Sequence, residues 1–317
     1  MDYRGAFMRG FVQKIINQLP LLVHQERVQV HAALDEVDDY KKVCDIIESR
    51  QESDPHCPFC HRTRIYKHGH RSGLQRYKCV ACGKTFNALT HTPLARMRKK
   101  RLWLQYMNYM LDSLVLRDIA ERLEVDKKTA LLWRHHFSTW LYKDTPRVLE
   151  GIVEADETYF RISKKGNRHL NRKPHKRGGQ DSPRGLSKKQ VCVFTAADRS
   201  HHCLEFITGL GPVKGCWLDR VFQSRITDDS VLVTDGLKSY THFCQHNHIN
   251  HVIVERRSRG PYHIQHINAF HGRIKAWING HFRGVATKYL NHYLWWRHEL
   301  ENSHITDAIS LFRATIC

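Results

Sequence analysis

The sequence lacks any apolar run long enough to span a bilayer, and it has few acidic residues for its number of basic ones. Its first 22 residues lack the continuous apolar stretch and the small-residue cleavage site of a secretion signal, so we expect a cytoplasmic chain. No basic amphipathic helix stands alone, which argues against a membrane surface as partner. No internal repeat or low-complexity tract interrupts the 317 residues, and we expect about two or three globular domains.

The shortage of acids leaves a large positive charge. Fifty-one Lys and Arg residues against 31 Asp and Glu residues give a net charge of +20 and a pI of about 9.7. The 24 histidines add to this charge below neutrality. Such an excess indicates a polyanionic partner, above all nucleic acid.

Four of the ten cysteines form two tight pairs, with eighteen residues between the pairs: Cys57, Cys60, Cys79 and Cys82. Two C-x2-C pairs around a glycine-punctuated, β-prone segment are typical of a zinc ribbon, in which four thiolates hold one structural Zn²⁺. A redox pair or chance spacing is the alternative, but about 30 residues build too little core to fold without a metal. We predict a zinc ribbon over residues 51–90, after an N-terminal helical segment over residues 1–50.

Residues 91–148 hold two short runs with apolar residues at helical spacing. The apolar stripe of the first run comprises Leu116, Ile119, Ala120 and Leu123, and that of the second comprises Leu131, Leu132 and Phe137. Between the two runs, Val125 falls in the turn and Asp126 can cap the second helix. This pattern predicts a helix-turn-helix DNA-binding domain, with an ordinary helical hairpin as the alternative. Along the second helix we expect four DNA contacts, Lys127, Lys128, Thr129 and Arg134.

Residues 149–317 differ from the preceding part of the sequence, because they contain several short β-rich runs. Strands and helices follow in the order β-β-β-α-β-α-β-α, which predicts a mixed five-stranded sheet with helices on its faces and a multidomain α+β fold class overall. Directly after the first strand, residues 161–189 form a basic loop. The loop residues that we expect to contact DNA are Lys164, Lys165, Arg172, Lys173, Lys176 and Arg177, although for any one of them a solvated position is as reasonable.

The first of these strands, "GIVEADETYF", gathers three acids in a segment where burial of charge is costly: Glu154, Asp156 and Glu157. Asp235 directly follows a second apolar strand, "VLVT". Because the predicted topology makes these two strands neighbours, Asp156 and Asp235 can converge and hold a divalent metal. The alternatives are a strand-edge surface acid paired with Lys or Arg for Asp156, and a turn residue for Asp235, since Asp-Gly is a common turn pair.

A third ligand is expected from the helical region that begins near His266. Asn268 and Lys275 lie within about 20° of each other beside an apolar stripe, so Asn268 could offer a carbonyl oxygen to the metal and Lys275 could contact a phosphate. His271 is a weaker candidate for the phosphate contact. Asn also favours the helix N-cap, in which case the third ligand would be Glu157, Glu255 or Glu299.

These motifs, in this order from about Cys57 onward, resemble the insertion-sequence transposases of the IS1595 (ISXO2-like) family. The resemblance implies an RNase H-like catalytic domain over residues 149–317 and a DNA transposase that binds terminal inverted repeats and catalyses metal-dependent strand cleavage and strand transfer. It places the two acidic ligands on Asp156 and Asp235, the third position on Asn268 and the trailing lysine on Lys275.

Most acid-triad transposases carry Glu at the third position, whereas this family includes members with Asn, so we expect an active enzyme with weaker metal affinity. The expected catalytic cofactor is Mg²⁺ or Mn²⁺, as two ions. The expected partners are the double-stranded DNA of the element ends and of the target, and a homodimer or higher oligomer in a prokaryotic nucleoid. Two other functions stay open: a DNA-binding regulator with an inert third domain, and a structure-selective DNA nuclease.

Overall fold

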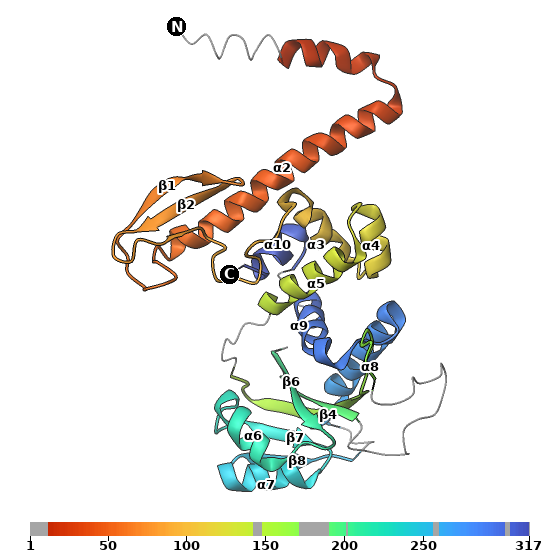
Figure 1. Ribbon diagram of the computed structural model, residues 1–317. Helices are drawn as coiled ribbons and strands as arrows, with labels where there is room; N and C mark the ends of the chain where they lie inside the picture. Colours follow the sequence, from red (N-terminus) through yellow and green to blue (C-terminus); the bar gives the residue numbers. More distant parts are fainter. Residues whose placement is uncertain are drawn as a thin grey trace. The chain divides into compact units, whose positions relative to one another are not determined.

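The computed structural model describes residues 12–141, 148–170, 190–200, 202–255, 260–301 and 305–316. The chain divides into two compact units, drawn in Figure 1: Met1–Asp112 with Leu116–Trp133 and Thr306–Cys317, and Ser113–Val115 with Arg134–Ile305. The last residues of the chain thus group with the N-terminal ones, whereas the sequence-based scheme joined them to residues 149–317; the predicted domain limits stay predictions. No helix among the described residues has the length and apolar character that crossing a membrane requires.

The first unit combines one long helix, a small sheet and several short helices. Its elements are α2 (His24–Ser53), β1 (Ile65–Arg71), β2 (Leu74–Cys79), β3 (Thr85–Phe86), α3 (Trp103–Leu111), α4 (Leu116–Arg122), the first half of α5 (Lys127–Leu141) and α10 (Ala308–Ala314). Residues 12–18 are helical as well. The predicted N-terminal helical segment is therefore confirmed where the structure describes it.

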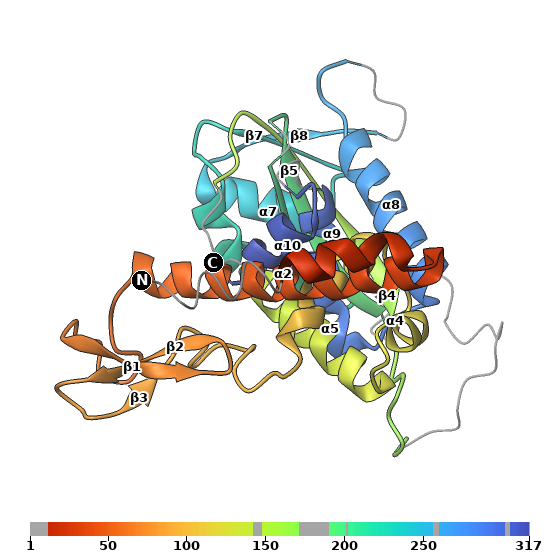
Figure 2. The ribbon, with the colours of Figure 1, turned by 90° about the horizontal axis from the view of Figure 1, so that it is seen from above.

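The strands β1, β2 and β3 form an antiparallel sheet in that order, and Figure 2 shows the sheet beside α2. Gly73 in the β1–β2 turn has a φ of +77°, and a Cβ atom there would lie 2.0 Å from the Tyr40 hydroxyl of α2. The positive φ favours glycine, and any other residue would also require the Tyr40 side chain to move. Under the sheet lies a core of just four buried residues, Cys57, Tyr77, Cys79 and Phe86.

The short helices of the first unit surround the buried face of α3. Trp103 is fully buried there and its ring packs on Phe312 of α10, with ring centroids 5.9 Å apart. This contact explains why the C-terminal helix groups with the N-terminal part of the chain.

The helices α4 and α5 are joined by a short turn, as the sequence predicted. The Asp126 carboxylate accepts the Lys128 backbone N–H at 2.7 Å, so the predicted helix cap is confirmed. The predicted stripe of α5 is wrong at one position, because Leu132 is 47% exposed and the neighbouring Trp133 is buried instead. Two helices joined by a turn also occur in plain hairpins, so the DNA-binding helix-turn-helix stays a prediction.

The second unit is built on a mixed five-stranded sheet. Its elements are β4 (Ile152–Arg161), β5 (Gln190–Asp198), β6 (Cys203–Leu210), α6 (Gly215–Val221), β7 (Val231–Thr234), α7 (Lys238–Asn247), β8 (Asn250–Ile253), α8 (Gln265–Phe282) and α9 (Leu290–Glu301), with the second half of α5. The strand order is β6-β5-β4-β7-β8, in which β5 runs antiparallel to both of its neighbours and β4, β7 and β8 are parallel. The predicted mixed five-stranded sheet, the order of its strands along the chain and the adjacency of the first and fourth strands are confirmed.

Helices cover both faces of this sheet. Side chains of α6 and α7, such as Leu218 and Phe243, pack with Val153 and Ala155 of β4 in the main core. On the opposite face, α8 packs on β4 and β5, and α9 packs on the edge strand β6. The acid-bearing strand β4 is therefore the centre of a covered sheet.

Candidate active site

The strand β4 presents its acids to different neighbours because successive side chains point to opposite faces. Asp156 faces α8, and its Oδ2 atom lies 3.7 Å from the His271 ring. Glu157 faces α7, where its carboxylate accepts the Tyr240 hydroxyl at 2.6 Å. A central, covered strand excludes the alternative of a strand-edge surface acid for Asp156.

The carboxylates of Asp156 and Asp235 lie close enough for their charges to interact. Burial raises the pKa of Asp156 to about 6; the Glu157 N–H, which donates to Asp156 at 2.8 Å, opposes this rise, the Asp235 charge adds to it, and the Lys275 charge again opposes it. A buried acid beside a second acid is unfavourable as an anion unless a cation binds between them. This donor set fits a hard divalent cation such as Mg²⁺.

Asp235 occupies a tight turn at the carboxyl end of β7. Its Oδ1 atom accepts the Leu237 N–H at 3.3 Å, and Gly236 has a φ of +85°, where a Cβ atom would lie 2.7 Å from Ile253. The turn interpretation is thus right about the local geometry. It leaves Oδ2 without a hydrogen bond among the described residues, so the turn does not compete with metal binding.

The helix α8 brings Lys275 to the acids and carries Asn268 two turns earlier along the same face of the helix. Asn268 and Lys275 are seven residues apart, and the Lys275 charge acts on Asp156. The N-cap of α8 is Ile264, so the alternative that Asn268 caps the helix is wrong. Asn268 is exposed, and no described contact joins it to either aspartate. Its role as third ligand stays a prediction.

His271 is buried between the sheet and α8. Its Nε2 atom lies 3.1 Å from the Thr195 hydroxyl of β5, and burial, aided by the Lys275 charge, lowers the pKa of the ring to about 4. A neutral imidazole supplies no positive charge to a phosphate, which favours Lys275 for that contact, and the weaker candidacy of His271 stays a prediction. The ring instead holds a fixed position beside Asp156.

Of the alternative acids, Glu157 lies nearest to the pair. Burial raises its pKa to about 7, its hydrogen bond from Tyr240 lowers it, and the charges of Asp156 and Asp235 raise it further. Neither Glu255 nor Glu299 is among the charges that act on Asp156.

Glu154 has a role that the sequence did not reveal. Its buried carboxylate accepts the backbone N–H groups of His266 and Ile267 at 3.0 and 3.2 Å, so a residue of β4 caps the N-terminus of α8. The Arg199 guanidinium reaches the same carboxylate at 2.8 Å and donates to the Pro261 carbonyl. His263 also lies near this carboxylate, but the guanidinium already supplies the positive charge that a metal would bring. The one sequence signal for this role is an acid two residues before Asp156, on the same face.

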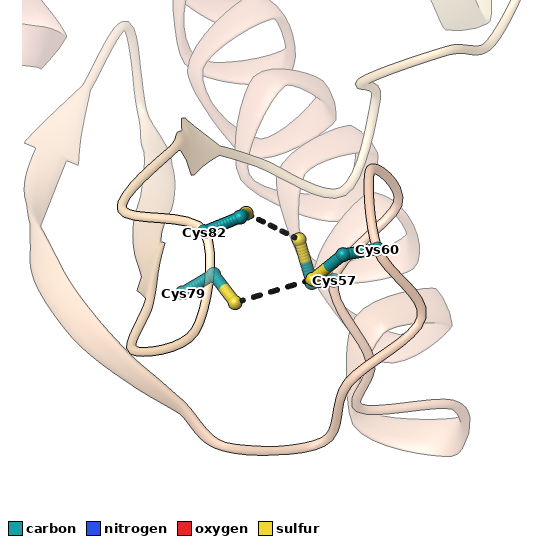
Figure 3. Close-up of side chains that lie close together, drawn as sticks. All are labelled: Cys57, Cys60, Cys79 and Cys82. Carbon is teal, nitrogen blue, oxygen red and sulfur yellow. Dashed lines mark hydrogen bonds between the residues drawn. The ribbon is translucent and has the colours of Figure 1, made fainter.

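The four paired cysteines come together in the first unit, as Figure 3 shows. The Sγ atoms of Cys57 and Cys82 are 3.7 Å apart and those of Cys60 and Cys79 are 3.6 Å apart. Four thiolates at about 2.3 Å from a tetrahedral zinc ion stand about 3.8 Å from one another, so the cluster fits such an ion. The Cys82 backbone N–H points at the Cys79 sulfur and lowers the pKa of that thiol to about 7, against the effect of burial.

Nine of the ten predicted DNA contacts fall into three groups. Lys127, Lys128 and Lys164 are exposed, and Thr129 is half-buried. Lys165 is exposed but donates to the Phe282 and Gly284 carbonyls at the end of α8, both at 3.0 Å. The residues outside the described part of the chain are Arg172, Lys173, Lys176 and Arg177.

The prediction that Arg134 contacts DNA is wrong, because this residue is only 1% exposed. It donates to the Leu114 carbonyl at 2.6 Å, and its guanidinium lies 5.0 Å from the Trp296 ring and 5.4 Å from the Phe282 ring. A basic residue in a helix is not necessarily on the surface when aromatic rings can surround it.

A comparison with known protein families agrees with the sequence motifs. Residues 148–296 match the ISXO2-like transposase domain, so the predicted resemblance is confirmed over this part of the chain. The chain is 25% identical over 260 residues to an uncharacterized protein in transposable element ISH50 of Halobacterium salinarum, covering 78% of this chain and 86% of the relative. The crystal structure of a pre-cleavage Mos1 transpososome aligns with a TM-score of 0.29 at 13% identity, over 67% of this chain and 73% of that one.

Proposed function

We propose that the chain is a DNA transposase that binds the terminal inverted repeats of an insertion sequence and catalyses metal-dependent strand cleavage and strand transfer. The observation that carries the proposal is the approach of Asp156 to Asp235, within the residues that match the ISXO2-like transposase domain. A regulator with an inert third domain would have no need for two acids that repel each other on a covered sheet.

In the proposed site, Asp156 and Asp235 hold the divalent ions, and Asn268 completes the ligand set. Mg²⁺ or Mn²⁺ bound there, as two ions, would polarise the scissile phosphodiester and promote ionisation of an attacking water. Lys275 faces the phosphate, and Glu154 holds the first turn of α8 so that Asn268 and Lys275 keep their places. Water attack at an element end frees a 3′-hydroxyl, which then attacks the target DNA by in-line displacement.

Double-stranded DNA is the proposed partner of both units. In the first unit, the exposed Lys127 and Lys128 would meet DNA at the start of α5, in a helix-turn-helix arrangement, beside the zinc ribbon in sequence. Lys164 and the basic residues after it would add phosphate contacts in the second unit. Since two ends must be joined to one target, we propose that the working form is a homodimer or a higher oligomer.

Strand transfer in vitro tests the proposal. DNA with the flanking terminal repeats, incubated with the full chain and Mg²⁺ or Mn²⁺, should give joined products that disappear in Asp156→Ala, Asp235→Ala and Asn268→Ala while DNA binding is retained. Asp228→Ala and Asn279→Ala, at exposed positions, are matched controls that should keep activity.

Three outcomes would overturn the proposal or part of it. Binding without cutting under either metal would make the chain a regulator. Cutting of branched DNA without joining would make it a nuclease. Full activity in Asn268→Ala, with loss in Glu157→Gln, would move the third ligand to Glu157.

A further inference from the structure

The edge strand β6 carries a second group of metal-binding side chains. Cys203 and Glu205 are two residues apart on this strand and therefore point to the same face, and His298 belongs to α9, which packs on β6. One ligand atom from each of these three residues lies within 4.8 Å of the other two.

Glu205 is the unusual member of this group. It is 9% exposed, and both of its carboxylate oxygens lack a hydrogen-bond partner within the described parts of the chain. A buried carboxylate without partners costs several kcal/mol or stays protonated, and native proteins rarely keep one without a reason.

The charged residues around Glu205 relieve little of this cost. The nearby Glu301 carboxylate repels it, and the Arg297 charge opposes that repulsion with a smaller effect. Both nearby arginines already bind Glu301, whose carboxylate accepts hydrogen bonds from Arg273 at 3.1 and 3.2 Å and forms an ion pair with Arg297. The Glu205 carboxylate thus meets a thiol and an imidazole.

We propose that Cys203, Glu205 and His298 bind a zinc ion that fastens α9 to the edge of the sheet. A thiolate, an imidazole and a carboxylate are the three ligand types of protein zinc sites, with water as a fourth ligand, whereas Mg²⁺ avoids sulfur. The ion would satisfy both buried oxygens of Glu205 and would help α9 to cover an edge strand that is otherwise open to pairing.

This site is separate from the acid pair on β4. Asp156 pairs with Thr195 across the sheet and Thr195 pairs with Glu205, so two strand spacings, about 10 Å, separate the two acids. The two ions of a phosphoryl-transfer site stand only about 4 Å apart. The zinc site therefore does not depend on the proposed function.

A competing explanation is a direct ion pair between Glu205 and Arg297. The Arg297 Nε atom is also buried without a hydrogen-bond partner among the described residues, and a small rotation of either side chain could join them. In that case the carboxylate would need no metal.

The zinc content of the full-length chain, purified without chelator and measured by mass spectrometry, separates the two explanations. We expect about two zinc ions per chain in the wild type, one at each cysteine site, and about one in Cys203→Ser, Glu205→Gln and His298→Asn. Cys57→Ser should lose the other ion. Two variants should keep the wild-type zinc content. Cys216→Ser changes an exposed cysteine of the same unit. Asp156→Ala changes the acid pair, and an unchanged zinc content there shows that the acid pair does not hold one of the two zinc ions.

Hydrogen exchange covers the case that a variant fails to fold. Chelation of the wild type should speed amide exchange in β6 and α9, and added zinc should reverse the change, while β4 and β5 stay protected. A wild type with about one zinc ion, lost in Cys57→Ser, and no effect of chelator on β6 or α9 would overturn the proposal in favour of the Arg297 pair.

Discussion

The cysteine ribbon and the acid-bearing sheet each gather ligands, but they differ in what holds the ligands in place. The ribbon takes all four thiols from a short stretch between Cys57 and Cys82, over a core of four buried residues. The sheet unit takes Asp156 and Asp235 from different strands and supports them with a core of sixteen buried residues. We therefore expect the ribbon to need an ion to fold, whereas we expect the sheet to fold first and to hold its acids ready for an ion.

The largest expected effect is the collapse of the ribbon without its ion. Cys79→Ser should remove most of a zinc-binding free energy of about 10 kcal/mol, so amides of β1 and β2 should lose their protection from hydrogen exchange. Amides of β4 and β5 should keep theirs, because their apolar core does not include the four cysteines of the ribbon. Cys216→Ser is the matched control, and equal loss of protection in both sheets would erase the difference between the two regions.

Loss of one acid of the pair should lower activity without lowering stability, in contrast to loss of a cysteine of the ribbon. Asp156→Asn should lower strand transfer on the order of 10³-fold, about 4 kcal/mol in the activation free energy, because a metal ligand is lost. Thermal unfolding should stay the same or rise, since the change removes one of two repelling acids. Asp228→Asn should alter neither quantity. A large fall in the unfolding temperature would mean that Asp156 holds the fold together.

A smaller effect is expected at the cap of α8. Glu154→Gln removes the charge that the two backbone N–H groups and Arg199 share, and should cost about 2 kcal/mol of unfolding free energy. Strand transfer should also fall, with DNA binding retained, because the helix that carries Asn268 loses its anchor. The exposed Glu150→Gln is the control. Unchanged exchange rates in the first turn of α8 would contradict the cap.

The smallest predicted effect is a pH dependence of the second unit. Burial, with the nearby charges of His292, Arg134 and Lys288, lowers the pKa of His135 to about 3. Below the ordinary histidine pKa the unfolded chain therefore binds a proton that the folded chain does not, so stability falls as the pH drops from 7 to 5. A fully buried ring would lose about 2 kcal/mol over this range, and solvent screening of a ring that is not fully buried reduces the loss to about 1 kcal/mol.

Denaturant unfolding at the two pH values measures this slope. His135→Asn should lower the stability at both, because the ring stacks on Tyr289 at 3.6 Å, but should flatten the slope. The exposed His281→Asn should leave the slope unchanged. A slope that survives in His135→Asn would locate the titration elsewhere.

Patterns that are local in sequence were predicted well. The spacing of the cysteines indicated the cluster, because both pairs sit in tight turns at the open end of one hairpin, one before β1 and the other at the end of β2. The short β-rich runs indicated the five strands, and their order with the helices indicated the sheet, because short connections leave few topologies. Asp126 was identifiable as a cap because the groups it binds are two residues away.

Contacts between distant residues were not predictable in the same way. Arg134 lies in a basic, helical stretch, and nothing local to it shows that rings from α8 and α9 surround it. Glu154 precedes α8 by more than a hundred residues, so its role as the cap of that helix exists only in the folded sheet. The same holds for Glu205 of β6, because its burial and its repulsion by Glu301 depend on how α9 packs on the strand.

The sequence by itself determined which side chains could bind metal and which strands would carry them, since ligand type and strand pattern are properties of short segments. Only the tertiary structure decided which acids face a neighbouring acid, a helix end or a hydroxyl. Burial and charge are sums over neighbours that chain order does not specify, and those sums separate Asp156, Glu154 and Glu157 although they stand side by side in one strand.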